Sequence, residues 1–404
     1  MRILLLANSY PTRATPSGAP YMTHRVTAIN NLNHPNLHLQ PIALTPTYTP
    51  PVRLLRAAMH APTHTDQQLA PHAQNTGWLS TPAHWNLIDT IASRTAHTPT
   101  HAIHTATTAL IHHCHQEPQP YDIIHAHGMY SLAAGHIAAA LAHHLHIPYV
   151  VTMHGSDVTH TITHNPRTAV NTLNHAAATI YVSNALRTHA TDLGMPRTNS
   201  HVIPNGVDLN LFTNPNTPTP TPDPWQHTTG PRLLYVGNLL PIKGADRLPA
   251  ILNTITHTHP HAHLVIAGDG PLHNQLTNHP NITLLGRQPH HHIPALMHAA
   301  DLLLVPSRAE GWGCVVTESY AACTPVVATD TGGLRESALD ATALVTPPNN
   351  TTTENDFIHH FATRALTILA NPPSPQHMTQ HTQNHSWHNT VTAEIDILRS
   401  ALTS

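Results

Sequence analysis

The chain has 404 residues, more than one ordinary hydrophobic core serves, so we expect two domains. Its formal net charge of −3 at pH 7 provides no overall basic field, which argues against general nucleic-acid binding. Three cysteines without scaffold spacing indicate free thiols in a reducing compartment.

Histidine and proline are unusually abundant, at 42 and 38 residues, whereas lysine occurs once, as Lys243. The enriched residue types share codons rich in C and A, so we attribute them to a mutational bias of the gene. This bias weakens histidine runs, such as 112–115 and 290–293, as evidence for a metal site. Neither H-E-x-x-H nor C-x-x-C occurs, and we predict no metal site.

In the first half of the chain, short apolar runs alternate with helical patterns. The first run is too short for a signal peptide, and no run is long enough to span a membrane, so we expect a soluble, cytoplasmic protein. Residues 131–145 have a helical pattern, whereas 34–120 are broken by prolines and should form long connections. Buried strands are predicted at 3–7, 122–127, 149–154, 179–183 and 201–205.

Residues 213–231 contain six prolines in nineteen residues, which predicts an extended linker. Strand patterns then resume at 232–238, 263–270, 281–287, 301–307, 324–330 and 342–347. We therefore predict an α/β fold of two doubly wound, Rossmann-like domains, 1–212 and 232–384, facing across a cleft. Ligands of such sheets bind beyond the carboxyl ends of the strands, so the cleft is the expected site.

The chain has only six glutamates, and three of them, Glu310, Glu318 and Glu336, fall within 27 residues. Glu310 lies on a turn after a predicted strand, and Glu318 lies one turn inside the following helix. Carboxylates only accept hydrogen bonds, which suits the hydroxyl groups of ribose and hexose. The alternative is an ordinary turn with two surface glutamates.

The turn itself, Gly311-Trp312-Gly313-Cys314, would let the backbone approach a ligand closely. Free N–H groups at the start of the helix could then bind a diphosphate. Lys243 lies at a second strand–turn–helix junction, in VGNLLPIKGADRL, where its charge could neutralise a phosphate. The alternative there is a solvated lysine at a surface turn.

Two further strands end in HAHG (125–128) and MHGSD (153–157). At those ends His127, His154 and Asp157 would point at the cleft, where they could contact a sugar. For His125 we favour an incidental histidine. No D-x-D occurs, so the leaving group should be stabilised by positive charge and a helix dipole rather than by a metal ion.

Taken together, these segments resemble glycosyltransferase family four, which comprises retaining enzymes with the GT-B fold. EGWGCVVTE matches the E-x7-E element of the family. VIPNGVD, VGNLLPIKG, AGDGP, LGRQP and TPVVATDTGGLRE occur along the chain in the order that is usual for the family. VTMHGSDV and HAHG look like the branch that builds cell-surface polysaccharides and glycolipids.

The resemblance implies a role for each candidate residue. Glu310 would contact the donor hexose, Glu318 the ribose, and Lys243 with the amides near Gly313 the diphosphate. His154 would lie near the anomeric carbon or the 6-hydroxyl of the donor. Further implied positions are Gly18 beneath the diphosphate and Asn238, which stands where many members have a phosphate-binding arginine. Arg308 and Arg335 are then the candidates for the second cation, and Ser17-Gly18 replaces a usual glycine pair.

The family implies transfer of a hexose from a nucleotide diphosphate sugar, UDP-linked rather than GDP-linked, to a sugar or lipid-linked acceptor, with no cofactor. Two alternatives remain, a nucleotide-sugar epimerase of the same fold and a non-catalytic nucleotide-sugar-binding subunit. The last segment, 385–404, should form a helix that crosses back onto the first domain. A weak peripheral membrane contact through 50–61 is a further prediction, and the sequence does not determine the oligomeric state.

Overall fold

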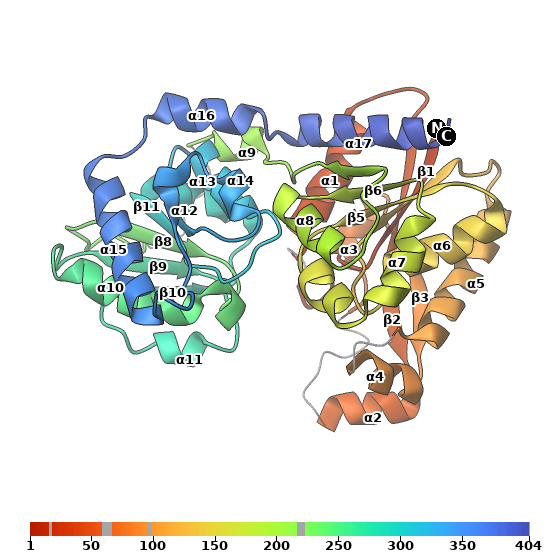
Figure 1. The fold of residues 1–404 in the computed structure, drawn as a ribbon, viewed down its shortest axis with the longest axis horizontal. Coiled ribbons are helices and arrows are strands. Elements are labelled where there is room, and N and C mark those ends of the chain that lie inside the picture. The colour runs from red at the N-terminus through yellow and green to blue at the C-terminus, as the bar shows by residue number, and fades with distance from the viewer. Residues whose placement is uncertain (16–17, 59–66, 95–97, 216–222, 404) are drawn as a thin grey trace. The chain divides into compact units, whose positions relative to one another are not determined.

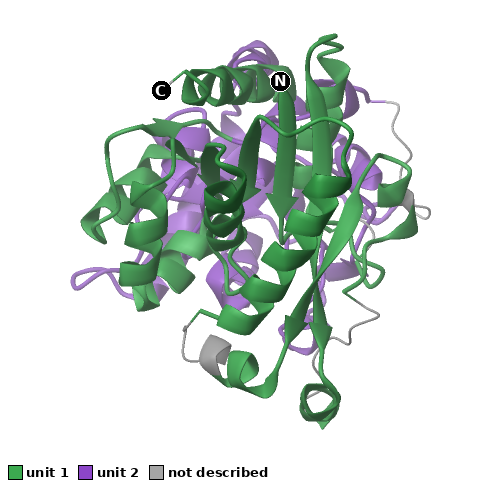
Figure 2. Cartoon of the chain, turned by 90° about the vertical axis from the view of Figure 1, so that its right-hand side faces the viewer, with its two compact units in different colours: residues 1–204, 387–404 green, residues 205–386 purple. Residues whose placement is uncertain are grey.

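A computed structural model of the protein describes residues 1–15, 18–58, 67–94, 98–215 and 223–403. These residues form two compact units, one made of residues 1–204 and 387–404 and the other of residues 205–386 (Figures 1 and 2). Each unit contains a parallel β-sheet with helices packed on both faces. The predicted fold of two doubly wound, parallel-sheet α/β domains is therefore confirmed.

Unit 1 contains a seven-stranded sheet in the order β3-β2-β1-β4-β5-β6-β7. Its strands are β1 (Arg2–Ala7), β2 (His38–Tyr48), β3 (Leu79–Trp85), β4 (Ile123–His127), β5 (Tyr149–Met153), β6 (Ala178–Tyr181) and β7 (Ser200–Val202). The five strands predicted for this half lie on β1, β4, β5, β6 and β7, whereas β2 and β3 fall where we expected only connections.

The prolines of β2 explain why the sequence concealed this strand. Pro41 lies in the part of β2 that pairs with β1, through residues 38–43, before most of the pairing with β3 begins. Pro46 lies beyond that part, where β2 pairs with β3 alone. Each proline thus has an unpaired side on which its missing N–H costs no ladder hydrogen bond. The strand forms despite a pattern typical of a loop.

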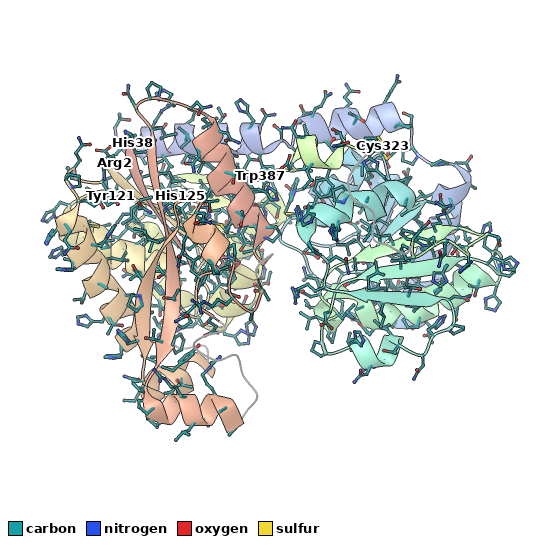
Figure 3. The ribbon with its side chains drawn as sticks, turned by 180° about the vertical axis from the view of Figure 1, so that it is seen from behind. Arg2, His38, Tyr121, His125, Cys323 and Trp387 are labelled. Atoms are coloured by element: carbon teal, nitrogen blue, oxygen red, sulfur yellow. The ribbon has the colours of Figure 1, made fainter. Side chains whose placement is uncertain are left out.

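The helices of unit 1 cover both faces of this sheet. They are α1 (Pro20–Asn31), α2 (Pro50–Ala58), α3 (Pro71–Gln74), α4 (Leu87–Arg94), α5 (Thr100–Gln116), α6 (Ala134–Leu145), α7 (Pro166–Asn174), α8 (Asn184–Asp192), α17 (Trp387–Ala401) and a π-helix (Asp157–Ile162). Trp387, labelled in Figure 3, begins α17 and packs with Val391 against the sheet residues Ile3 and Val150.

Unit 2 contains a six-stranded sheet in the order β10-β9-β8-β11-β12-β13. Its strands, all predicted, are β8 (Arg232–Val236), β9 (His263–Ala267), β10 (Ile282–Gly286), β11 (Leu302–Val305), β12 (Val326–Thr329) and β13 (Leu344–Val345). Alternate strand residues face opposite sides. Leu233 and Leu302 pack with α10 (Leu248–Thr256) and α15 (Glu354–Ala370). Leu234 and Leu303 pack with α12 (Ile293–Ala299) and α13 (Cys314–Ala321).

The helices of unit 2 are α9 (Leu209–Phe212), α10 (Leu248–Thr256), α11 (His273–Leu276), α12 (Ile293–Ala299), α13 (Cys314–Ala321), α14 (Leu334–Ser337), α15 (Glu354–Ala370) and α16 (Pro375–Gln383). Short 3₁₀ turns occur at Pro241–Lys243, Ala245–Arg247, His290–His292 and Ala341–Ala343. No described helix of the chain is both long and apolar enough to cross a membrane.

The units change at 204/205 and 386/387, not at the predicted boundaries of 212 and 384. Phe212 and Trp225 account for the first difference, because both are buried in the core of unit 2. The described parts of the predicted linker, 213–215 and 223–231, therefore belong to that unit. Residues 216–222 lie outside the described residues.

Candidate functional site

In unit 2, the loops that follow β8, β9 and β11 meet at the carboxyl end of the sheet. A Cβ on Gly244, whose φ is +67°, would stand 1.9 Å from the carbonyl oxygen of Pro306. A Cβ on Gly268 would stand 1.8 Å from the carbonyl oxygen of Gly237. Side chains are thus excluded at both contacts, and backbone packs on backbone. This packing fixes the positions of the polar side chains that the loops carry.

Lys243 and Glu310, predicted for different parts of a ligand, contact each other in the structure. Lys243 Nζ lies 2.7 Å from both carboxylate oxygens of Glu310. The Ser307 hydroxyl donates a third hydrogen bond to this carboxylate, at 3.0 Å. The lysine side chain is 32% exposed and the glutamate 13%, so a ligand can reach the pair. The cation can meet an anion while the carboxylate accepts from hydroxyls.

The turn between Glu310 and α13 is fixed by its packing against the loop before α14. Gly313, with a φ of +91°, precedes the helix, and a Cβ there would lie 2.5 Å from Leu334 Cδ2. Gly333 N–H donates to the Glu310 carbonyl at 3.1 Å. Gly311 is held through the same loop, because a Cβ on Gly333 would lie 2.2 Å from its carbonyl oxygen.

The two other predicted residues of this turn, Trp312 and Cys314, differ in how far their side chains are buried. The Trp312 indole is 3% exposed, and its ring lies 5.2 Å from that of His385. It packs inside unit 2, so a ligand could meet only the backbone of this residue. Cys314 is the first residue of α13, half-buried and free of any disulfide.

Glu318 has a partner, His290, that local sequence patterns do not reveal. Its Oε1 lies 3.1 Å from Nε2 of His290, and the two side chains are 15% and 20% exposed. Burial opposes the charge on His290, but the hydrogen bond and the charge of Glu318 outweigh it and raise the histidine pKa above its usual value. His290 belongs to the run 290–293, in which the sequence offered no reason to expect a contact with Glu318.

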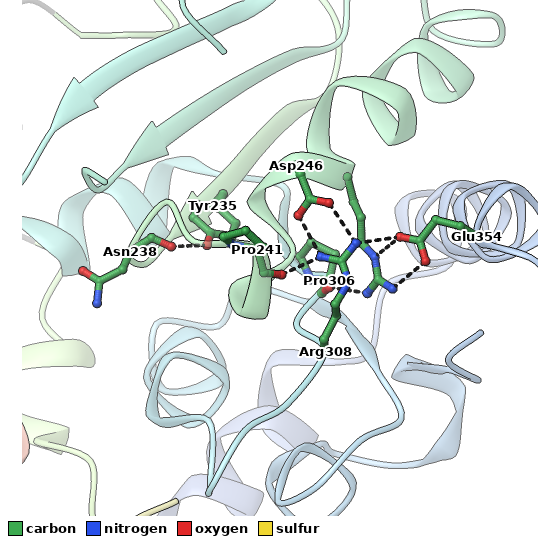
Figure 4. A network of polar contacts seen from close by, with 8 residues as sticks. Tyr235, Asn238, Pro241, Asp246, Pro306, Arg308 and Glu354 are labelled. Carbon is green, nitrogen blue, oxygen red and sulfur yellow. Dashed lines mark hydrogen bonds and ion pairs between the residues drawn. The ribbon is translucent and has the colours of Figure 1, made fainter. Parts of the chain in front are cut away.

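Both arginines proposed as the second cation are held by carboxylates. The Arg308 guanidinium lies 2.7 and 2.8 Å from the Asp246 oxygens and 2.9 Å from Glu354 Oε1 (Figure 4). Arg247, which is buried, also binds Glu354, at 2.6 Å. Arg335 pairs with Asp330 at the surface. Asn238 has an exposed side chain, and its backbone carbonyl oxygen accepts a hydrogen bond from the Tyr235 hydroxyl at 3.0 Å.

In unit 1, the predicted residues His127 and His154 form one cluster at the ends of β4 and β5. His127 Nδ1 lies 3.1 Å from His154 Nε2, and the rings stack at a centroid distance of 5.3 Å. Burial is the main cause that holds both pKa values well below the usual value, so the imidazoles are neutral. His154 Nδ1 has no partner among the described residues.

Asp157 does not point outward as predicted, because its side chain is fully buried. The carboxylate accepts backbone N–H groups of His154, Gly155, Val158 and, at 3.4 Å, Met129. Burial raises its pKa, and these hydrogen bonds oppose the rise. Asp157 therefore organises the loop that carries His154 rather than presenting a charge to a ligand.

Gly18 lies on the loop before α1, where its N–H donates to the carbonyl of Thr15 at 2.8 Å. A Cβ on Gly18 would stand 2.8 Å from Thr15 Oγ1, so this tight turn favours glycine. The neighbouring Ser17 lies outside the described residues. Within the part of the chain that the structure describes, no group of three or more His, Cys, Asp and Glu side chains is arranged to hold a metal ion.

Two family models match most of the chain. Residues 222–385, with Lys243, Glu310 and Glu318, match the model of group 1 glycosyl transferases. Residues 64–211, with His127, His154 and Asp157, match glycosyltransferase family 4. The chain belongs to the family 4 glycosyltransferases. Gly18 lies outside both matched segments.

Curated relatives of this glycosyltransferase include TuaC of Bacillus subtilis, which is attributed to teichuronic acid biosynthesis. The two are 28% identical over 340 residues, which cover 83% of this chain and 82% of TuaC. Glycogen synthase of Mycobacterium tuberculosis is 28% identical over 303 residues, or 69% of each chain.

Solved structures of similar fold include Anabaena HepE in complex with UDP. Its TM-score is 0.67 at 20% identity, with 99% of this chain and 100% of HepE covered. Sucrose-phosphate synthase of Thermosynechococcus elongatus gives a TM-score of 0.70 at 18% identity, with complete coverage of both chains. The fold of this glycosyltransferase is thus of the GT-B type.

Proposed function

We propose that the protein transfers a hexose from a UDP-sugar to a sugar or lipid-linked acceptor, with retention of configuration and without a metal ion. The observation that carries this proposal is the accessible Lys243–Glu310 pair beside the start of α13, with Glu318 one turn further along the helix. The UDP and UDP-glucose complexes of HepE support the nucleotide. The assignment of TuaC supports a cell-surface polysaccharide or glycolipid as product.

Each residue has a distinct task in this proposal. Lys243 leaves Glu310 to bind the diphosphate, together with backbone N–H groups at the start of α13. Glu310, released from the lysine, accepts a hydrogen bond from a hydroxyl of the hexose. Glu318 accepts hydrogen bonds from the ribose hydroxyls. His154, a neutral imidazole, contacts the transferred sugar, and His127 holds its ring in place.

No side chain is placed as a nucleophile in this scheme. The bond between the anomeric carbon and the phosphate oxygen breaks, and the acceptor oxygen bonds to the same face of that carbon. The nucleoside diphosphate leaves with both electrons of the broken bond. Its phosphate oxygen also takes the proton of the acceptor hydroxyl. Lys243 and the helix dipole lower the energy of this step, because they stabilise the charge that develops on the phosphate.

A thermal-shift panel of UDP-, GDP- and ADP-sugars tests the donor. A ligand at one hundred times its Kd adds about 2.7 kcal/mol of stability, and we expect the largest shift with a UDP-hexose. Incubation with a pool of acceptors should release UDP and yield a product of retained configuration, with or without EDTA. Conversion of donor without acceptor would indicate an epimerase, and tight binding without UDP release a binding subunit. Loss of activity with EDTA that Mg²⁺ restores would refute metal independence.

For the acceptor side we further propose a peripheral contact with an anionic membrane through α2 and α4. Leu54 on α2 is 74% exposed, and Ile88 and Ile91 on α4 are 75% and 57% exposed. The two helices contact each other (Figure 1), and α2 also carries Arg53 and Arg56. Aliphatic side chains beside cations fit a surface with anionic headgroups. Of the predicted segment 50–61, residues 59–61 lie outside the described residues.

Co-sedimentation with phosphatidylglycerol vesicles tests the membrane contact. We expect Leu54→Glu and Ile88→Glu each to weaken binding roughly tenfold, since burying one such side chain contributes about 1.5–3 kcal/mol. Leu402→Glu is the matched control, because Leu402 is an exposed leucine at the end of α17, 40% exposed. Equal loss in all three variants would contradict the assignment. Concentration-dependent dimerisation that Leu54→Glu abolishes would instead make this face a contact with a second copy.

A further inference from the structure

A cavity of about 330 Å³ lies within unit 1, apart from the His127–His154 pair. Its walls are the loop after β4, the π-helix after β5, and the first turns of α6 and α7. Figure 1 shows α6 and α7 side by side, and they contact each other. Such a volume is at the lower end of small-molecule sites, which suits one sugar ring better than an extended chain.

The cavity wall is more apolar than polar, and none of its side chains is an Asp, Glu, Lys or Arg. Its polar groups include the hydroxyls of Ser131, Ser156, Thr161 and Thr168 and the amide of Asn165. An anionic ligand would find no counter-charge here, and burying an unpaired charge is costly. A neutral ligand with several hydroxyls could form hydrogen bonds with these groups.

One side of the cavity is apolar, and two glycines shape it. Tyr130 lies over Gly128, where a Cβ would stand 2.3 Å from the Tyr130 ring. Met129 lies against Gly135 of α6, where a Cβ would stand 2.3 Å from the methionine sulfur. The glycine of the HAHG motif therefore allows Tyr130 to pack at the end of β4. Met129 and Tyr130 both line the cavity, and no Asp, Glu, Lys or Arg lines it with them. They provide an apolar surface for the C–H face of a sugar.

Another part of the cavity wall is a π-helix, Asp157–Ile162. π-Turns are rare and occur frequently at functional sites. Here the buried Asp157 carboxylate ties down the start of the turn through backbone N–H groups, and Thr163 Oγ1 donates to the carbonyl of Val158 at 2.9 Å. The turn is thus fixed, and it presents His160, Thr161 and Ile162 to the cavity.

His136 contributes a further directed polar group. Its Nδ1 lies 2.7 Å from Thr172 Oγ1, which fixes the ring and leaves Nε2 for a ligand. Burial lowers the pKa of His136 to about 4, so the ring is neutral at pH 7. The cavity therefore stays uncharged at neutral pH on this side as well.

We propose that this cavity binds one neutral sugar unit of the acceptor. The inference rests on the proposed glycosyl transfer and names the substrate class of its second substrate. Hydroxyl, amide and imidazole groups would recognise the hydroxyls of the sugar, and Met129 with Tyr130 its apolar face. Uronic acids and sugar phosphates should bind more weakly, because no lysine or arginine lines the cavity to pair with them.

Ligand-observed NMR by saturation transfer tests the inference on the full chain, with methyl α-glucoside, methyl α-galactoside and methyl N-acetylglucosaminide as probes. Glucuronic acid and glucose 6-phosphate are the charged comparisons. Thr168→Trp would place an indole in the cavity, and we expect it to reduce the signal of the neutral glycosides at least fivefold. Asn174→Trp is the matched control, since Asn174 is exposed at the other end of α7 and does not line the cavity.

Titration with UDP separates this inference from the proposed function. If UDP binds all variants equally while neutral glycosides bind all but Thr168→Trp, both stand. If UDP binds but no neutral glycoside binds, or Thr168→Trp binds glycosides as well as wild type, the cavity assignment is overturned and the donor assignment is not. Charged sugars that bind as well as neutral ones and are lost in Thr168→Trp also overturn it. Ser131→Trp, at an exposed lining position on the loop after β4, repeats the test should Thr168→Trp not fold.

Discussion

The contact between Lys243 and Glu310 changes how the two most informative residues of the sequence are understood. The sequence assigned the lysine to phosphate and the glutamate to sugar, as separate contacts. In the structure they neutralise each other at 2.7 Å, so donor binding has to replace an existing ion pair. Because the pair is partly exposed, water screens it and the exchange costs little. The resting pair also keeps Lys243 beside the place proposed for the phosphates.

Lys243→Ala tests the lysine. We expect it to weaken UDP by roughly 1.5–3 kcal/mol, about 10- to 150-fold, because a charge-assisted contact to phosphate is lost. Uridine has no phosphate, and its affinity should stay within twofold of wild type. Isothermal titration of both ligands measures the difference. Equal losses for UDP and uridine would place Lys243 outside the phosphate site.

Glu310→Gln and Glu318→Gln should fail in different ways. Glu310 is assigned to the sugar that gains positive charge as its bond breaks, so kcat should fall on the order of 10²–10³. UDP should bind Glu310→Gln at least as well as wild type, since Lys243 no longer has to leave a carboxylate. Glu318 is assigned to ribose, which does not change during the reaction. Glu318→Gln should therefore raise the KM for the donor and weaken the binding of UDP, while kcat stays nearly unchanged.

Steady-state kinetics beside UDP titration distinguishes the two variants. Glu336→Gln is the control, because Glu336 follows in the same segment but has no assigned ligand contact. A loss of UDP affinity in Glu310→Gln with none in Glu318→Gln would reverse the assignments. Unchanged kinetics and binding in both would show that neither glutamate belongs to the donor site.

Single residues differ in how far the sequence could place them. Glu310 and Lys243 stand out because glutamate and lysine are rare in this chain. His290 could not be singled out among 42 histidines, and its partner Glu318 lies 28 residues away in sequence. Asp157 was placed at the correct strand end, but a short motif does not show whether a carboxylate faces a ligand or accepts backbone N–H groups. Burial decides that, and burial depends on the packed fold.

At the level of elements, strands with simple apolar runs were predictable and β2 was not. Its prolines at 41 and 46 normally exclude a central strand, yet each has one side without a ladder partner. That freedom depends on the stagger of β1 and β3, which a local pattern does not contain. The C-terminal helix α17, unlike β2, is apparent from its local sequence pattern. Its apolar spacing is clear, but its strongest polar contact is with a residue near the start of the chain.

This contact is the ion pair between Arg25 of α1 and Glu394 of α17. Arg25 Nε lies 3.0 Å from Glu394 Oε1, and both side chains are 0% exposed. The Arg25 guanidinium also lies 5.2 Å from the ring centroid of Trp387. Two buried charges are stable only as a pair, so each depends on the other. The pair joins the two ends of the chain within unit 1.

Glu394→Ala should therefore destabilise unit 1 by about 3–5 kcal/mol, because it leaves the Arg25 charge buried without a partner. The double variant Arg25→Met/Glu394→Leu should recover most of this loss, since two apolar side chains need no partner. Urea unfolding measures both. Asp396→Ala, which removes the exposed pair with Arg399 on the same helix, should cost less than about 1 kcal/mol. A small effect of Glu394→Ala, or no recovery in the double variant, would contradict the assignment.

At the scale of the whole molecule, the abundance of histidine has a consequence for stability. Several described histidines are buried as neutral rings. Those whose pKa values are lowered most lie mostly in unit 1. Burial lowers the pKa of His125 to about 3 and that of His136 to about 4, and it holds those of His127 and His154 well below the usual value. In unit 2, burial lowers the pKa of His385 to about 4, whereas that of His290 is raised.

These shifts predict that the protein loses stability in mild acid. A histidine with a lowered pKa binds a proton in the unfolded chain below pH ~6.5 but not in the folded chain until a much lower pH. The unfolded state therefore binds more protons between pH ~6.5 and ~4, and the free energy of unfolding falls as the pH falls through this window. For His125 alone the loss at pH 5 is about 2 kcal/mol, from ~1.5 pH units at 1.36 kcal/mol each.

Urea unfolding at several pH values between 7.5 and 4.5 measures this slope. It should be steepest for unit 1, because four of the five described histidines with the most strongly lowered pKa values lie there. His125→Gln removes one titrating group and should flatten the slope by close to one proton, although loss of its 2.8 Å contact with Thr152 lowers stability at every pH. His104→Gln is the control, because His104 is exposed on α5. A stability that is constant from pH 7.5 to 5 would show that these histidines bind protons as readily in the folded chain as in the unfolded chain. A slope that His125→Gln leaves unchanged would show the same for His125 alone.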